Sequence, residues 1–190
     1  MPLERLGPRA CAAPVARADA RVTLEARRAF VLTVSDGVAR GTRHDESGAR
    51  LAERLAAAGY RVAQGVVADD AAELAAAVQA AARDHDLVVT TGGTGLTPRD
   101  VTPQALVPLL DYQVPGLGEL MRSEGLRSTP FASLSRSFGG VLGRTLVLAV
   151  PGSPGGAIES LEAVLPVLEH AHETIGDDSA RHAQPSQHGH

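Results

Sequence analysis

Short runs of strand-forming residues alternate along the chain with longer segments in which apolar residues recur at helical spacing. The short runs predict strands over residues 30–34, 61–67, 87–91 and 145–150. The longer segments predict helices over residues 47–59, 71–83, 103–110, 116–123 and 157–173. Strands that alternate with helices in this way predict an α/β fold, with three αβα layers and a mostly parallel sheet covered on both faces.

The two ends of the chain lack this patterning. Residues 1–28 mix Arg, Ala and Pro without a sustained period, and they are predicted to form a flexible extension. Residues 176–190 are polar and predict a disordered tail. One domain is therefore expected over residues 29–175. Within this domain, the glycine-rich segment 137–142 is expected to add a short hairpin strand at one edge of the sheet.

Composition removes several classes of function. All 18 cationic residues are arginine, which excludes a lysine nucleophile and a P-loop nucleotide hydrolase. The single cysteine, Cys11, excludes an internal disulfide and a cysteine-rich metal site, and it fits a reducing, cytoplasmic location. A net charge of −4 and 3% aromatic residues argue against a nucleic-acid partner. No apolar run approaches the roughly 20 residues of a membrane span.

Polar, turn-forming residues follow each of the four predicted parallel strands. In an open parallel sheet, ligands bind outside the carboxyl ends of the strands. The segments expected to converge there are Ser35-Asp36, Asp69-Asp70, Gly92-Gly93-Thr94-Gly95 and Pro151-Gly152-Ser153. Their convergence predicts a ligand site at this edge and is more informative than any one of the segments.

The glycine-rich segment 92–95 can cradle a phosphate or a carboxylate, because glycine lets backbone N–H groups approach a ligand closely. The alternative is an ordinary strand-to-helix turn. Thr102 is expected to cap the next helix, and Pro103 suits its first turn. Asp69 and Asp100 are predicted to hold Mg²⁺ beside bound phosphates. Alternatively, Asp100 and Asp69 serve as helix-start residues, and Asp70 competes with Asp69 for the cap.

Three further candidates depend on context. Ser35 and Asp36 suit recognition of a hydroxyl or a base, or form a turn. Ser135 and Arg136 can hold a phosphate, or lie at a solvated helix end. Glu119 lies three residues before Arg122, so an intrahelical ion pair is the simpler account of that residue.

Taken in order, several of these segments resemble the molybdopterin-binding family that includes MogA, MoaB and the G domain of gephyrin. The resemblance covers residues 28–174. The residues that carry it are Ser35-Asp36, Thr90-Thr91-Gly92-Gly93-Thr94-Gly95, Arg99-Asp100-Val101-Thr102-Pro103, Pro115-Gly116-Leu117-Gly118-Glu119-Leu120-Met121-Arg122, Leu134-Ser135-Arg136 and Pro151-Gly152-Ser153-Pro154.

The resemblance implies a molybdopterin-binding-like αβα fold and an Mg²⁺-dependent adenylyltransferase. Such an enzyme transfers AMP from ATP to the terminal phosphate of molybdopterin and releases pyrophosphate. Asp100 and Asp69 match the family's carboxylates and would hold Mg²⁺ and the triphosphate. The other residues that it places at the cofactor site are Ser35, Asp36, Gly92, Gly93, Thr94, Gly95, Glu119, Ser135, Arg136, Pro151, Gly152 and Ser153.

The same resemblance implies a homotrimer, or a hexamer built from two trimers, and a molybdate-insertion enzyme as a partner. Two departures keep other functions open. Gly155 stands where some adenylyltransferases carry lysine, and Gly37 stands where some carry arginine. A carrier or scaffold that binds molybdopterin without catalysis is therefore the alternative. A third possible function is that of a related pyridine-nucleotide or molybdate-insertion domain with the same fold.

Overall fold

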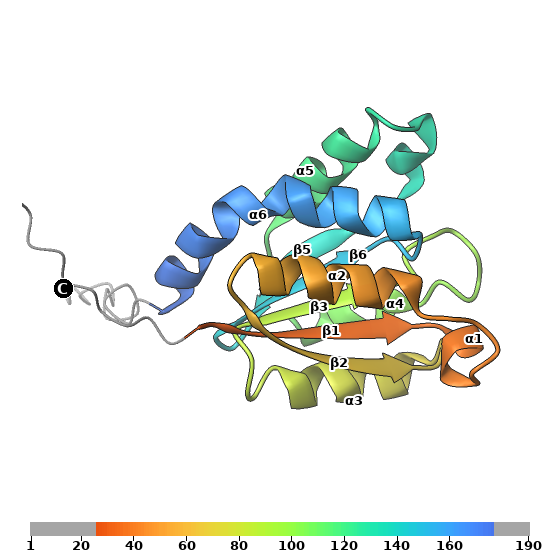
Figure 1. Ribbon diagram of the computed structural model, residues 1–190, viewed down its shortest axis with the longest axis horizontal. Helices are drawn as coiled ribbons and strands as arrows, with labels where there is room; N and C mark the ends of the chain where they lie inside the picture. Colours follow the sequence, from red (N-terminus) through yellow and green to blue (C-terminus); the bar gives the residue numbers. More distant parts are fainter. Residues whose placement is uncertain (1–25, 177–190) are drawn as a thin grey trace, which may run out of the picture.

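The computed structural model describes residues 26–176, which form a six-stranded sheet between two layers of helices (Figure 1). The strand order is β2-β1-β3-β6-β5-β4. The first four of these strands run parallel: β2 (Arg61–Val67), β1 (Arg28–Val34), β3 (Leu87–Thr91) and β6 (Thr145–Val150). The predicted α/β class with a mostly parallel sheet is confirmed.

Three helices cover one face of the sheet and two cover the other. The first face carries α2 (Glu46–Ala57), α5 (Pro115–Gly125) and α6 (Pro154–Gly176). The second face carries α3 (Ala71–Ala81) and α4 (Thr102–Leu106). Strand β3 is buried throughout, with Leu87 and Val89 in one core and Val88 in the other, as the two-residue period of a central strand requires.

The antiparallel part of the sheet differs from the prediction. The expected hairpin strand is β5 (Phe138–Leu142), which pairs antiparallel with β6. It is not the edge strand, because β4 (Tyr112–Gln113) pairs on its outer side. A two-residue strand has too little pattern to be recognised from the sequence.

Other short elements were also unforeseen. The loop after β1 forms α1 (Asp36–Ala39). The helix predicted over 103–110 ends at Leu106 and continues as η1 (Val107–Leu109), where Pro108 removes a backbone donor. A second 3-10 helix, η2 (Pro130–Leu134), precedes β5.

The ends of the domain differ slightly from their predicted positions. β1 begins at Arg28, and α6 continues through Pro166 to Gly176. The predictions of a flexible extension and a disordered tail fall mainly on residues 1–25 and 177–190, which lie outside the described residues. Within the described part of the chain, no helix has the length and apolarity needed to cross a membrane.

Candidate functional site

The loop after β3, residues 92–95 and hereafter the glycine loop, lies at the carboxyl ends of the parallel strands. Gly92 and Gly93 have φ values of 107° and 64°, which side-chain-bearing residues rarely adopt. A Cβ at Gly92 would lie 2.4 Å from the carbonyl oxygen of Val34, and a Cβ at Gly93 would lie 2.4 Å from Thr102 Oγ1. Glycine is therefore required at both positions, and the capacity of this loop to cradle a phosphate stays a prediction.

Thr102 fastens this loop to α4, which corrects its predicted role. The expected N-cap function is wrong, because the N-cap position is Val101 and no side chain caps this helix. Instead, the buried Thr102 hydroxyl donates to the carbonyl oxygen of Gly92 at 2.8 Å. The backbone N–H of Thr102 donates to the carbonyl oxygen of Gly93 at 3.0 Å. The proline in the first helical turn lacks an N–H and so reduces the need for a cap.

Arg136 supports the other half of the glycine loop. Its Nε donates to the carbonyl oxygen of Gly95 at 2.7 Å, and its Nη2 donates to that of Asp100 at 2.5 Å. The backbone N–H of Arg136 donates to the carbonyl oxygen of Thr94 at 3.0 Å. The guanidinium thus holds the loop backbone in shape, whereas the sequence predicted a contact with phosphate or a solvated helix end.

Asp36 and Asp69, hereafter the aspartate pair, join the ends of β1 and β2. The N–H of Asp36 donates to Asp69 Oδ2, and the N–H of Asp69 donates to Asp36 Oδ1, both at 3.2 Å. Asp70 caps α3 by accepting from Glu73 N–H at 2.8 Å. Asp69 is therefore not the helix cap. Ser35 caps α1 through a 3.4 Å hydrogen bond from Val38 N–H.

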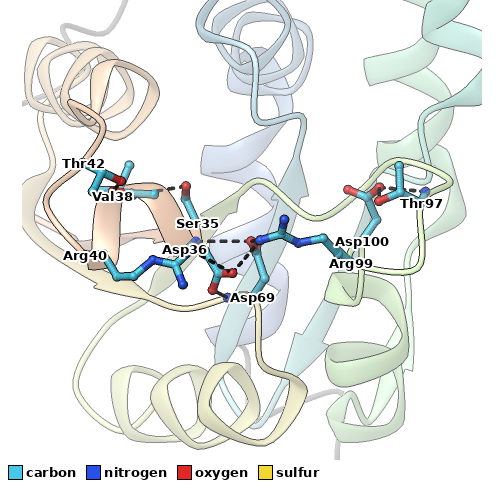
Figure 2. A network of polar contacts seen from close by, with 10 residues as sticks. Ser35, Asp36, Val38, Arg40, Thr42, Asp69, Thr97, Arg99 and Asp100 are labelled. Carbon is cyan, nitrogen blue, oxygen red and sulfur yellow. Dashed lines mark hydrogen bonds and ion pairs between the residues drawn. The ribbon is translucent and has the colours of Figure 1, made fainter.

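Arg99 reaches from the segment after the glycine loop to the aspartate pair (Figure 2). Its Nη2 lies 2.5 Å from Asp36 Oδ2 and 3.7 Å from Asp69 Oδ2. Arg40 pairs with the same oxygen of Asp36 at 3.3 Å. The hydrogen bond with Asp69 and the two guanidinium groups lower the pKa of Asp36, so its carboxylate is ionised at neutral pH.

Asp100 follows Arg99 but turns toward Thr97 (Figure 2). Its Oδ2 accepts from the Thr97 N–H at 2.8 Å and from the Thr97 hydroxyl at 2.6 Å. Burial acts to raise the pKa of Asp100. Hydrogen bonds from Thr97 and Gly95, with the charge of Arg136, outweigh this effect and lower the pKa.

Two cavities flank the glycine loop, and Gly93 and Gly152 line both. The polar cavity, of about 350 Å³, lies toward β1 and α2. Its walls include Ser35, Asp69, Gly92, Gly93, Gly152 and Ser153 among the predicted site residues. The apolar-walled cavity, of about 550 Å³, lies toward η2. Its walls include Gly93, Thr94, Gly95, Asp100, Ser135, Pro151 and Gly152 from the same set.

The structure thus gathers nearly all the predicted residues at one edge but divides the two candidate metal ligands. Asp69 lines the polar cavity and Asp100 the apolar-walled one. Glu119 lies elsewhere, in a hollow on α5 beside Leu117 and Leu120. Arg122 donates to the carbonyl oxygen of Ser137 at 2.7 Å, which ties α5 to the segment before β5.

Several residues at the site escaped the sequence analysis. Arg43 and His44 line the polar cavity from the loop before α2. Phe131 forms an exposed apolar wall of the other cavity, next to Leu134 of the segment 134–136 that carries the family resemblance. Assigning the polar loop before Asp45, the N-cap of α2, to the same sheet edge would have identified Arg43 and His44. The folding of η2 over the glycine loop has no local signal.

The donor chemistry is compatible with Mg²⁺. Among the described residues, no group of three or more His, Cys, Asp or Glu side chains could enclose a metal ion. Mg²⁺ does not need such a cage, because it takes one or two carboxylates and completes its shell with water and phosphate oxygens. Asp69 and Asp100 supply carboxylates of this kind on either side of the glycine loop.

Comparison with known proteins identifies relatives over most of the chain. A family model described as "Probable molybdopterin binding domain" matches residues 30–170. A molybdenum cofactor biosynthesis bifunctional protein of Chlorobaculum tepidum is 39% identical over 153 residues, 80% of this chain and 49% of that protein. A Helicobacter pylori protein named molybdopterin adenylyltransferase is 37% identical over 150 residues, 76% of this chain and 85% of that protein.

The fold comparison agrees with these sequence matches. The crystal structure of the molybdopterin biosynthesis enzyme MoaB from Thermus thermophilus has a TM-score of 0.73 and 51% identity. It covers 78% of this chain and 96% of the solved chain. The present chain spans about half the length of the bifunctional relatives, which are longer proteins.

Proposed function

The chain belongs to the molybdopterin-binding domain family, and on this premise we propose that it is a molybdopterin adenylyltransferase. It transfers AMP from ATP to the terminal phosphate of molybdopterin and releases pyrophosphate. The relative from Helicobacter pylori that carries this name supports the proposal, since it matches over 85% of its length.

The observation that carries the proposal is the pair of cavities that share Gly93 and Gly152. A transferase that joins two phosphate-bearing substrates must bring their phosphates together while their remaining parts lie apart. Two cavities that meet at an open glycine loop provide this arrangement. Backbone N–H groups in such loops bind phosphate oxygens, and Gly93 borders both cavities.

The chemistry needs no nucleophile from the protein. An oxygen of the terminal phosphate of molybdopterin attacks the α-phosphorus of ATP, and the bond from that phosphorus to the β-phosphate oxygen breaks. Pyrophosphate leaves with the bonding electrons. The attacking phosphate monoester is already largely ionised near neutral pH, since its second pKa is about 6, so no general base is required. This accounts for a site without lysine or cysteine.

The chain's own task is to orient two anions and offset their repulsion. Asp69 and Asp100 would hold Mg²⁺, which neutralises charge on the phosphates when bound. The glycine loop orients the phosphates, and Thr102 and Arg136 keep that loop rigid through contacts with its carbonyl oxygens. Ser35, Ser135 and Ser153 offer hydroxyl groups to the substrates from the cavity walls.

The alternative is a carrier that binds molybdopterin without adenylyl transfer. Gly155, where some adenylyltransferases carry lysine, stands in open space at the start of α6 and supplies no positive charge. Arg43 and Arg99 provide positive charge from other loops of the site, which favours the enzyme.

Three wider proposals follow from the family. We infer a homotrimer or a hexamer, a cytoplasmic location, and passage of the adenylylated product to a molybdate-insertion enzyme. Light scattering coupled to gel filtration distinguishes the oligomeric states. A monomer at micromolar concentration would contradict the inferred assembly.

The experiment that tests the function is pyrophosphate release from ATP, with Mg²⁺ and molybdopterin each added or omitted. We expect release only when all three are present. Tight molybdopterin binding without release would establish the carrier instead. If the chain binds neither molybdopterin nor ATP, it shares only the fold of its relatives.

A further inference from the structure

Arg99 places a positive charge against two carboxylates that the fold holds side by side. The side chains of Asp36 and Asp69 are 26% and 19% exposed, and reciprocal backbone hydrogen bonds keep them together. Two ionised carboxylates in this position repel each other unless a cation offsets their charge. The Arg99 guanidinium does so from 2.5 Å and 3.7 Å (Figure 2).

The Arg99 side chain is free to leave without disturbing the loop that carries it. It is 68% exposed, and ion pairs of such side chains are weak in water. The backbone of the next residue, Asp100, is held by Arg136, and the Asp100 side chain is held by Thr97. The guanidinium can therefore move while its own backbone remains in place.

We propose that Arg99 is the internal counter-ion of the aspartate pair, which a divalent cation replaces during the substrate-binding step. A metal ion at Asp69 repels the guanidinium. The freed Arg99 then binds the phosphate chain held at the glycine loop, a few residues before it, through charge-assisted hydrogen bonds. The inference rests on the proposed function, because it takes Asp69 as a metal ligand.

Removing the competing cation must strengthen metal binding. The test uses Mn²⁺ alone as a paramagnetic probe, with the full chain and without nucleotide, and measures free Mn²⁺ by electron paramagnetic resonance. We expect Arg99→Gln to bind Mn²⁺ about threefold to fivefold more tightly than the wild type, as expected for loss of an exposed ion pair. An affinity that is unchanged or weaker would overturn the proposal.

Arg40→Gln is the matched control. Arg40 is 67% exposed and pairs with Asp36 at 3.3 Å, and the two variants lose the same charge. Of the two arginines, only Arg99 is paired with Asp69 in the structure. We expect Arg40→Gln to change the Mn²⁺ affinity by less than about twofold. An equal gain in Mn²⁺ affinity in both variants would mean that only the net charge matters, which would contradict a specific exchange at Arg99.

Nucleotide binding provides a readout of opposite sign. We expect Arg99→Gln to bind ATP in the presence of Mg²⁺ about tenfold more weakly, because a charge-assisted contact with phosphate is lost. If the Arg99 ion pair only holds two loops together, its loss should weaken the binding of both metal and nucleotide. Opposite changes therefore support the exchange, and parallel losses overturn it.

Asp69→Asn separates this inference from the function on which it rests. If Asp69 is a metal ligand, its substitution weakens Mn²⁺ binding, and adding Arg99→Gln to it restores little. The proposed metal site fails if Asp69→Asn binds Mn²⁺ as the wild type does, and the exchange fails with it. Loss of Mn²⁺ in Asp69→Asn without a gain in Arg99→Gln overturns the exchange alone.

Discussion

Replacing Asp100 with asparagine separates a role in chemistry from a role in folding. The substitution removes the charge but keeps an oxygen that can accept from Thr97. The two hydrogen bonds, at 2.8 Å and 2.6 Å, then become neutral. A hydrogen bond to a charged group contributes about 1 kcal/mol more than a neutral one. Because Asp100 is partly exposed, we expect a total loss of about 1 kcal/mol rather than 2.

A loss of this size lowers the melting temperature by about 2–4 °C in a domain of this length. It leaves nearly all molecules folded at 25 °C, given the 5–15 kcal/mol that is typical of native domains. Loss of a carboxylate that holds Mg²⁺ should instead reduce pyrophosphate release by about 100-fold or more, in line with the removal of one electrostatic contact in other active sites. The two effects differ enough to be told apart.

The assay compares pyrophosphate release and melting temperature in the wild type, Asp100→Asn and Asp70→Asn. Asp70 is the control, because it caps α3 and asparagine caps helices equally well. We expect Asp70→Asn to match the wild type in both measurements. The reasoning is refuted if Asp100→Asn keeps more than about a third of the activity. It is also refuted if activity falls only as the folded fraction falls.

Three other perturbations test the loop and the core. Gly92→Ala should destabilise the domain by about 2–4 kcal/mol in denaturant unfolding, because its Cβ would meet a backbone carbonyl at 2.4 Å. Gly143→Ala, also at positive φ but with open space around it, should cost only about 1 kcal/mol. Thr102→Val should cost about 1–3 kcal/mol by leaving the Gly92 carbonyl oxygen unpaired, and Thr102→Ser should restore most of this loss. Burial lowers the pKa of His172 below its usual 6.5, so the folded state resists protonation of this side chain. The contribution of His172 to the free energy of unfolding is therefore fully present above pH 6.5, and it is lost as the pH falls through the pKa of the folded state. His172→Gln should reduce this pH dependence.

Each of these predictions has an outcome that contradicts it. Equal losses in the two glycine variants would mean that the contact with the β1 carbonyl does not constrain the loop. If Thr102→Ser is as unstable as Thr102→Val, the hydrogen bond from the hydroxyl to Gly92 does not stabilise the domain. An unchanged free energy of unfolding between pH 7 and pH 5 would mean that His172 does not resist protonation in the folded state.

The four parallel strands, the main helices and the edge of the sheet that carries the candidate site were predictable from local sequence. Parallel central strands are buried on both faces, so their continuous apolar runs are visible without knowledge of their partners. The carboxyl ends of such strands must share an edge. The glycine, serine and aspartate residues that follow them could therefore be placed together before any contact was known.

Only the tertiary structure decided how those residues divide the work. Asp69 and Asp70 are adjacent in sequence, yet one contacts Asp36 and the other caps α3, because only Asp69 faces the end of β1. Thr102 supports the glycine loop rather than its own helix, because the fold places its hydroxyl against the carbonyl oxygen of Gly92. The pairing of Arg99 with Asp36 spans 63 positions, and no periodicity or local propensity records a contact between loops so far apart.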